Sequence, residues 1–287
     1  MESKNKRVFL YLTIPLAVLV VISAVCGIFI KSTYVAETQN WRIQGIGQDM
    51  VDLFIAMPVL ITSGILAYRG NRAAFFVWGG TLLFLLYSYA IYCFAVHFNS
   101  LFLVYCFTFG LSVYSFTWLT LHLPAKKVKE WFDFKGQVKW FSGFLVSIAL
   151  IFYFLWLTDI VPAIVSGKMP LSYAGTGMLT NPVHVIDISI LLPGMVITAV
   201  FLLKKAPAGY LLTPILTVFF ILMACNIAWL VIFMKQKGIG DCLVVAKIMG
   251  IFAAIGSGVL YTFLRRLKKT SKKIHTPVAP LKKIRLL

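Results

Sequence analysis

The stretch that decides the fold class is residues 8–30, VFLYLTIPLAVLVVISAVCGIFI, which holds 23 consecutive residues without a charged side chain. An α-helix rises about 1.5 Å per residue, so about 20 apolar residues cross the hydrocarbon layer of a bilayer. Lys31-Ser-Thr-Tyr34 follows the run in place of a small-residue cleavage site. The run is therefore predicted to be a membrane helix that is kept in the mature protein.

Seven further runs of similar length and hydrophobicity follow along the chain. Of 287 residues, 60% are hydrophobic and 13% are charged, and the mean hydropathy is +0.91, which excludes a soluble globular enzyme. The sequence predicts an all-α polytopic membrane protein with eight transmembrane helices. Their expected positions are near 8–30, 50–68, 73–97, 101–123, 140–162, 182–203, 213–235 and 242–264.

The basic residues predict the orientation in the membrane. If the N-terminus is cytoplasmic, 21 of the 27 Lys and Arg residues fall in inner segments, 5 fall in outer segments, and Lys247 lies within a span. This bias predicts a multi-pass protein of the plasma membrane or the bacterial inner membrane, with both termini in the cytoplasm. The net charge of +18 is thus mainly a topology signal. The basic tail 265–287 is expected to contact anionic lipids, and no nucleic-acid partner is expected.

An offset of 135 residues aligns the chain with itself. It places Asp52 and Pro58 on Asp187 and Pro193, so that Pro follows Asp by six residues in both halves. The pattern favours a 4+4 parallel internal repeat, with a first half at 1–139, a second half at 140–264 and the tail beyond it. The alternative is that two apolar helices share an Asp and a Pro by chance.

Ionisable residues in a membrane span are costly, and they usually face the protein interior or a water-filled cavity. Here they gather near the outer ends of the second, sixth and eighth spans, where two carboxylates and one ammonium are expected to form a partly buried ion cluster. The candidate substrate- or ion-binding residues are Asp52, Asp187, Lys247, His184, Asp49, Gln48, Asn226 and His97.

Each of these candidates also has a structural interpretation. Asp49 and Asp52 fit first-turn acids that complement a helix dipole, and Lys247 fits a side chain that extends to the outer headgroups. His97 and His184 fit interfacial hydrogen-bonding residues. Asp187 lies beyond the first turn if Asn181 caps the helix and Pro182 opens it, so a cap does not explain it.

Two further patterns concern helix shape and packing. Pro58 and Pro193 are predicted to kink their helices, either as architecture or to supply backbone groups to a site. The last span carries a small residue at every fourth position, which allows close approach of another helix or of an oligomer partner, and Lys247 is expected to lie beside that interface. The stripe consists of Ala246, Gly250, Ala254 and Gly258.

Three function classes fit these features. The first is a permease or ion-coupled transporter for a small solute, with a polar site at the extracytoplasmic end of the second, sixth and eighth spans. The second is a membrane enzyme that acts on a lipid-linked substrate at the outer leaflet, and the third is a non-catalytic sensor or assembly subunit. P-loop, HExxH and GxSxG motifs are absent, the five cysteines show no metal-ligand spacing, and no cofactor or metal is indicated.

Overall fold

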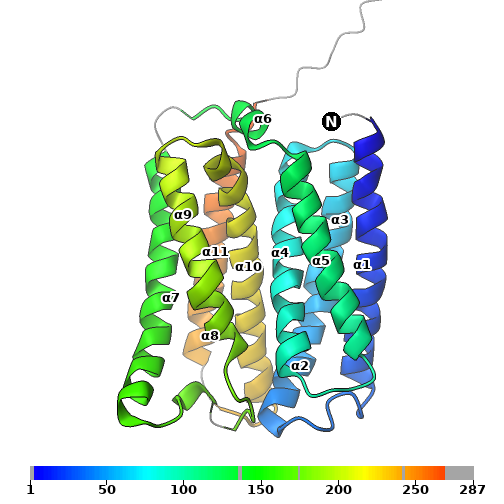
Figure 1. Ribbon diagram of the computed structural model, residues 1–287, viewed down its shortest axis with the longest axis vertical. Helices are drawn as coiled ribbons and strands as arrows, with labels where there is room; N and C mark the ends of the chain where they lie inside the picture. The colour runs from blue at the N-terminus through cyan, green and yellow to red at the C-terminus, as the bar shows by residue number, and fades with distance from the viewer. Residues whose placement is uncertain (1–2, 135–137, 174, 241–242, 269–287) are drawn as a thin grey trace, which may run out of the picture.

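The computed structural model describes residues 3–134, 138–173, 175–240 and 243–268, and this part of the chain is all-helical (Figure 1). Two of its segments are π-helical turns, η1 and η3, and one is a short 3₁₀ turn, η2. The elements are α1 (Ser3–Phe29), α2 (Gln39–Val51), η1 (Asp52–Ala56), α3 (Met57–Tyr68), α4 (Arg72–Ala95), α5 (Phe102–His122), α6 (Ala125–Glu130), α7 (Val138–Ser166), η2 (Leu171–Tyr173), α8 (Pro182–Ile186), η3 (Asp187–Leu191), α9 (Leu192–Leu203), α10 (Pro207–Gln236) and α11 (Leu243–Leu264).

Within the described residues, eight helices are long and apolar enough to cross a membrane, which confirms the predicted number of spans. The sixth span, Pro182–Leu203, has the predicted bounds. Asn181 caps it by accepting a hydrogen bond from the backbone N–H of Val183 at 3.0 Å, as expected. The chain is therefore an integral membrane protein whose helices contact the lipid bilayer.

The second span is longer than predicted, because its helix begins at Gln39 rather than near residue 50. Thr38 is the N-cap, and its hydroxyl accepts a hydrogen bond from the backbone N–H of Trp41 at 3.3 Å. The polar residues that lowered the hydropathy of this stretch make side-chain hydrogen bonds within the helix, such as that from Gln44 to Asn40 at 2.8 Å. A polar composition therefore concealed a helical extension of about three turns.

Two spans contain a π-helical turn, and each turn begins at an aspartate. The backbone N–H of Met57 bonds to the carbonyl of Asp52, and that of Leu192 bonds to the carbonyl of Asp187, five residues back in both cases. Pro58 and Pro193 follow directly and have no N–H to continue the usual α-helical ladder. A π-bulge, a feature that is frequent at functional sites, thus directly precedes the helical turn of each of these prolines.

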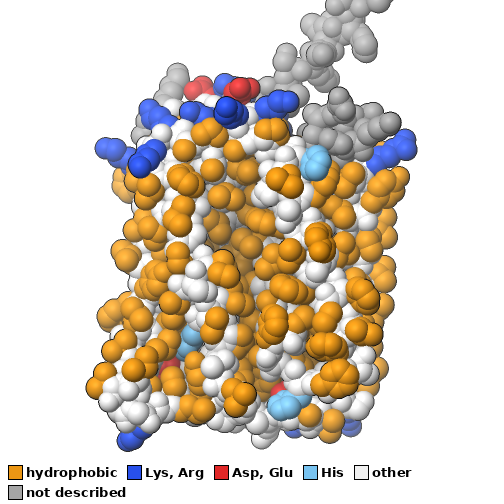
Figure 2. Space-filling model, viewed as in Figure 1, with side chains coloured by type: hydrophobic (Ala, Val, Ile, Leu, Met, Phe, Trp, Pro, Cys, Tyr) orange, Lys and Arg blue, Asp and Glu red, His pale blue; other side chains and the backbone are white. Residues whose placement is uncertain are grey.

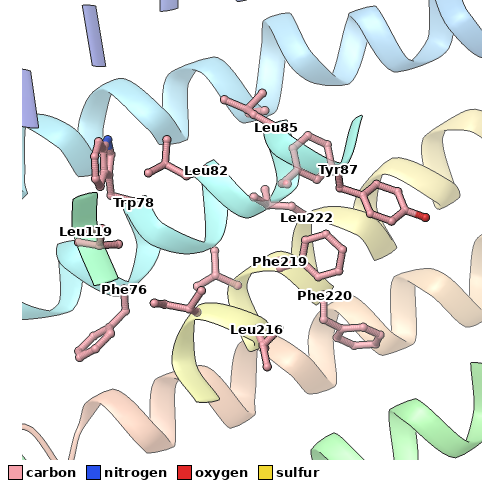
Figure 3. Close-up of a cluster of buried hydrophobic side chains, with 14 of the residues drawn as sticks. Phe76, Trp78, Leu82, Leu85, Tyr87, Leu119, Leu216, Phe219, Phe220 and Leu222 are labelled. Atoms are coloured by element: carbon pink, nitrogen blue, oxygen red, sulfur yellow. The ribbon is translucent and has the colours of Figure 1, made fainter. Parts of the chain in front are cut away.

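The helices form two groups, α1–α5 and α7–α11, which meet where α4 of the first packs against α10 of the second (Figure 1). Gly79 and Gly80 allow this close approach, since a Cβ at Gly80 would meet Val218 and would lie 2.7 Å from the backbone oxygen of Ile215. Figure 3 shows buried side chains of the two helices, among them Leu82, Leu85 and Leu216, packed into one cluster. The molecule thus has a packed hydrophobic core along its central helix pair.

The two ends of the bundle differ in charge. Lys and Arg side chains gather at the end that carries α6, few lie at the opposite end, and the flank between them is mostly hydrophobic (Figure 2). At the α6 end, Phe132 forms an antiparallel bridge with Leu267, and Arg72 lies 5.0 Å from the ring centroid of Trp131. Most of the predicted lipid-binding tail, from residue 269 onward, lies outside the described residues.

Candidate functional site

Asp49 and Asp52 lie inside the protein rather than at a helix end. Asp49 is ten residues beyond the start of α2, and both side chains are fully buried. This position overturns the interpretation of the two residues as first-turn acids, because the first turn of the helix lies at Gln39. Each carboxylate must therefore find partners within the bundle.

Gln48 connects Asp52 to two other helices. Its Nε2 donates to Oδ1 of Asp52 at 2.9 Å and to Oγ of Ser88 on α4 at 3.3 Å. Its Oε1 accepts a hydrogen bond from Nδ2 of Asn226 on α10 at 2.5 Å. The structure thus brings together three of the predicted residues, Gln48, Asp52 and Asn226, in one buried network.

Asp49 belongs to a separate set of contacts. It accepts hydrogen bonds from the hydroxyls of Tyr34 at 2.7 Å and Tyr92 at 2.8 Å. Burial, followed by the charge of Asp49, raises the pKa of Tyr34 well above its ordinary value, so this hydroxyl stays a neutral donor. A Cβ at Gly27 of α1 would collide with the Asp49 carboxylate, so these contacts also fix α2 against α1.

Asp187 and His184 lie on the other side of the bundle, next to Trp156 of α7. The indole Nε1 of Trp156 donates to Oδ2 of Asp187 at 2.9 Å. The buried ring of His184 lies between those of Trp156 and Tyr173, with centroid distances of 4.5 and 5.7 Å. Neither ring nitrogen of His184 has a hydrogen-bond partner among the described residues, so aromatic packing holds this side chain.

Lys247 does not join these residues. Its side chain is exposed on α11, and within the described ranges no salt bridge includes it, so the expected ion cluster does not form there. The reason is the face by which α11 packs: Gly256 contacts Phe220 and Ile221 of α10. Most of the small-residue stripe is likewise turned outward, since Ala246 is buried whereas Gly250, Ala254 and Gly258 are exposed.

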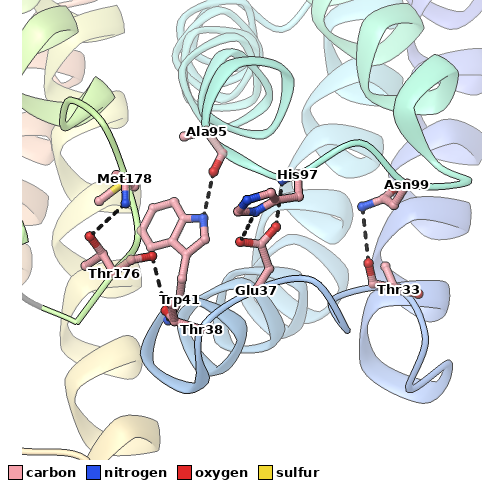
Figure 4. Close-up of polar contacts among 9 residues, drawn as sticks. All are labelled: Thr33, Glu37, Thr38, Trp41, Ala95, His97, Asn99, Thr176 and Met178. Atoms are coloured by element: carbon pink, nitrogen blue, oxygen red, sulfur yellow. Dashed lines mark hydrogen bonds and ion pairs between the residues drawn. The ribbon is translucent and has the colours of Figure 1, made fainter.

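His97 forms a contact that sequence reasoning missed, because its partner Glu37 stands in a polar connection with no recognisable pattern. Its Nδ1 lies 3.0 Å from Oε2 of Glu37, and its backbone N–H donates to Oε1 at 2.7 Å (Figure 4). The side chain of Glu37 is only 2% exposed. Nearby, Trp41 donates to the carbonyl of Ala95 at 2.9 Å and Thr38 donates to that of Thr176 at 3.1 Å.

A cavity of about 290 Å³ lies between the two groups of helices. Its wall comes from α2, α4, α7, α10 and the segment from α8 to α9. Gln48, Asn226 and Asp187 line it together with Glu37, whereas the lining does not include Asp49, Asp52, His184, His97 or Lys247. Asp52 is therefore linked to the cavity through Gln48.

The cavity is confined to one half of the bundle. Its wall on α10 runs from Phe219 to Met234, and Phe219 is twelve residues beyond Pro207, where the helix starts at the α6 end. The central cluster of Figure 3 packs between α4 and α10, and its members Tyr87, Phe219 and Phe220 also line the cavity. The lining extends at the other end to Glu37 and Trp41.

The described residues contain no group of three or more His, Cys, Asp and Glu side chains that could hold a metal ion. Four cysteines in this part of the chain, Cys26, Cys93, Cys106 and Cys225, are free thiols. No protein-family model, no curated protein and no solved structure matches the chain. The geometry of the cavity and its buried polar network is therefore the basis for a functional assignment.

Proposed function

We propose that the protein is a transporter that carries a small solute through the cavity between its two groups of helices. The observation that carries this proposal is the position of the cavity, which is lined by Asp187 of the second π-helical turn and by Gln48, the hydrogen-bond partner of Asp52 in the first. Transporters place their solute sites near the middle of the membrane, between structural repeats and beside interrupted helices.

The element bounds support the internal repeat on which such a mechanism depends. Adding 135 to the starts of η1, α3 and α4 gives the starts of η3, α9 and α10. The packing follows the same relation. In this repeat α2 corresponds to α8 and α10 corresponds to α4, and α2 contacts α10 just as α8 contacts α4. Under this proposal, each half comprises four membrane helices, and α4 and α10 are the equivalent central pair.

Under this proposal, Asp52 and Asp187 supply carboxylates that couple movement of the solute to that of a proton or a cation. A carboxylate that faces a cavity can hold a proton or a cation, and its occupancy can change as the cavity opens to one side and then to the other. The π-turns provide places where backbone hydrogen bonds can rearrange, with Pro58 and Pro193 as fixed kinks beside them. Release of the solute requires the central cluster between α4 and α10 to separate.

The topology and partner predictions form part of the same proposal. The basic α6 end lies in the cytoplasm together with both termini, and the cavity faces the extracytoplasmic side of the plasma or bacterial inner membrane. The tail contacts anionic lipids. The outward-facing residues Gly250, Ala254 and Gly258 allow close contact with a second helix or a second copy of the chain.

Cysteine accessibility tests transport without knowledge of the solute. The five native cysteines are replaced by alanine, and Met223, which lines the cavity, is changed to Cys. A membrane-impermeant methanethiosulfonate reagent is then applied to vesicles of either orientation. The matched control is Ile190→Cys in η3, which is 63% exposed on the outer flank and is expected to stay unreactive in lipid.

The expected result is that Met223→Cys is modified from both faces of the membrane. In alternating access, the same cavity wall opens first to one face and then to the other. Modification from the extracytoplasmic face alone contradicts transport. That outcome favours the two other classes, a membrane enzyme that acts on a lipid-linked substrate at the outer leaflet or a non-catalytic sensor or assembly subunit.

A further inference from the structure

The charge of the cavity wall is opposite to that of the whole chain. The protein carries a formal charge of +18, yet Glu37 and Asp187 are the charged residues among the described side chains that line the cavity, and neither Lys nor Arg is present there. Glu37 is paired with His97, whereas Asp187 accepts a hydrogen bond from the indole N–H of Trp156 and has no salt bridge among the described residues. A carboxylate in such an apolar surrounding is best compensated by a positive charge.

The hydrogen-bond donors of the wall are largely committed to protein acceptors. The indoles of Trp41 and Trp156 donate to Ala95 and Asp187, and the amides of Gln48 and Asn226 donate within the buried network. The hydroxyls of Tyr34 and Tyr92 donate to Asp49. The buried hydroxyl of Tyr87 also lines the cavity and has no hydrogen-bond partner among the described residues, but it lies under the influence of the negative charge of Asp187. An anionic solute, which needs donors, would therefore find few of them away from a carboxylate.

The wall also has a spare hydrogen-bond acceptor. Oδ1 of Asn226 is buried and has no hydrogen-bond partner among the described residues, although the residue is only 3% exposed and lines the cavity. An unpaired buried acceptor is costly, and a ligand with an N–H group would satisfy it. This second observation, independent of charge, also points to a cationic donor.

Aromatic side chains complete the arrangement. Eight of them line the cavity, including Trp41, Trp156 and Phe152. The negative faces of aromatic rings attract cations, and an ammonium group gains most from them where water is excluded. The rest of the wall, with residues such as Ile148 and Met195, is apolar and suits a hydrocarbon portion.

We infer that the cavity binds a small amphiphilic organic amine in its protonated form. The ammonium group lies between Asp187 and Asn226, and the hydrocarbon portion extends along α7, α9 and α10. The volume of about 290 Å³ limits the ligand to a compact arylalkyl or short alkyl amine. The inference rests on the proposed function, because it assigns a solute class to the same cavity.

A head-group series tests this inference on the wild-type protein. Full-length protein in lipid nanodiscs is equilibrated at pH 7 with tritiated 2-phenylethylamine, and unlabelled 2-phenylethylamine, 2-phenylethanol and 3-phenylpropionate compete for the site. Aliphatic amines are protonated at this pH, so the three competitors are cationic, neutral and anionic. Saturable binding is expected, with the neutral and anionic compounds at least about tenfold weaker. Absence of saturable amine binding, or equal competition by the alcohol or the acid, overturns the inference.

Variants then locate the ammonium group. Asp187→Asn is expected to weaken amine binding at least about tenfold, while Asp187→Glu retains it and guards against a folding defect. Asp133→Asn is the matched control, because Asp133 is an exposed acid at the α6 end and does not line the cavity. Unchanged amine affinity in folded Asp187→Asn overturns the assignment.

The two proposals fail separately. Amine binding combined with one-sided modification of Met223→Cys supports the amine site and contradicts transport. Two-sided modification without saturable amine binding supports transport and contradicts the amine.

Discussion

The amide nitrogen of Asn226 donates a hydrogen bond to Oε1 of Gln48 at 2.5 Å, although 178 positions separate the two residues in sequence. The contact joins α2 of the first group of helices to α10 of the second at the wall of the cavity. Gln48 also donates to Asp52, so one side chain connects a buried carboxylate to the opposite half of the molecule.

Removal of either amide should destabilise the protein. Gln48→Leu leaves a buried carboxylate oxygen and the Asn226 amide without their partner, and Asn226→Leu leaves Gln48 Oε1 unpaired, at a cost of about 1–3 kcal/mol each. The double variant should lose less than the sum of the two. Thermal denaturation in detergent measures these effects, with Gln44→Leu as the control because its bond to Asn40 is local. Strictly additive losses would show that the two residues are not coupled.

A methyl group at the centre of the bundle should be poorly tolerated. Gly80→Ala introduces a Cβ that meets Val218 and the backbone oxygen of Ile215, so the variant should lose about 1–3 kcal/mol of stability. Gly110→Ala is the matched control on α5, where a Cβ meets nothing within 4 Å. The control should retain or slightly gain stability because alanine favours helix more than glycine does. Equal melting temperatures for the two variants would contradict the close packing of α4 and α10.

Loss of Glu37 should loosen the connection between α4 and α5. The backbone N–H of His97 donates to Glu37, so Glu37→Ala frees this amide and removes a charge-assisted hydrogen bond worth about 1.5–3 kcal/mol. Hydrogen exchange of peptides that contain His97 should accelerate by about tenfold or more. Glu130→Ala, which removes an exposed acid at the α6 end, should leave the rate unchanged.

The orientation can be tested with two exposed lysines at opposite ends. In the cysteine-free background, Lys168→Cys in the connection after α7 should react with an impermeant maleimide on intact cells. Lys127→Cys in α6 should react only after permeabilisation. The reverse pattern would invert the proposed topology and would place the opening of the cavity in the cytoplasm.

The sequence predicted the eight spans because long apolar runs leave little choice of structure in a bilayer. It misplaced the start of the second span, since the stretch from Gln39 to Gln48 is polar and its side-chain hydrogen bonds depend on the folded helix. Helix packing also decided the position of Lys247, because the rotation of α11 against α10 is set by Gly256 and its neighbours.

Candidate site residues were partly accessible from the sequence. Intramembrane polarity indicated Gln48, Asp52, Asp187 and Asn226, all of which belong to the cavity wall or to the network behind it. Glu37 was not found, because a single acid in a connecting segment has no periodic signature. Trp41 of the aromatic wall was also not found, since Trp near a span end is a typical interface anchor.

Each π-turn places a second backbone acceptor one residue away from the one that its last N–H uses. In η1 the N–H of Met57 bonds to Asp52, while the carbonyl of Leu53, the partner in an α-helix, is one residue away. If the N–H changes from one acceptor to the other, the extra residue of the π-turn moves along the helix, and the helix keeps its length. Each such step turns the intervening side chains by about 100° about the axis. Asp52 and Asp187 stand at the first position of such a turn, so a shift of one hydrogen bond would re-aim a carboxylate while the ends of the helix remain in place.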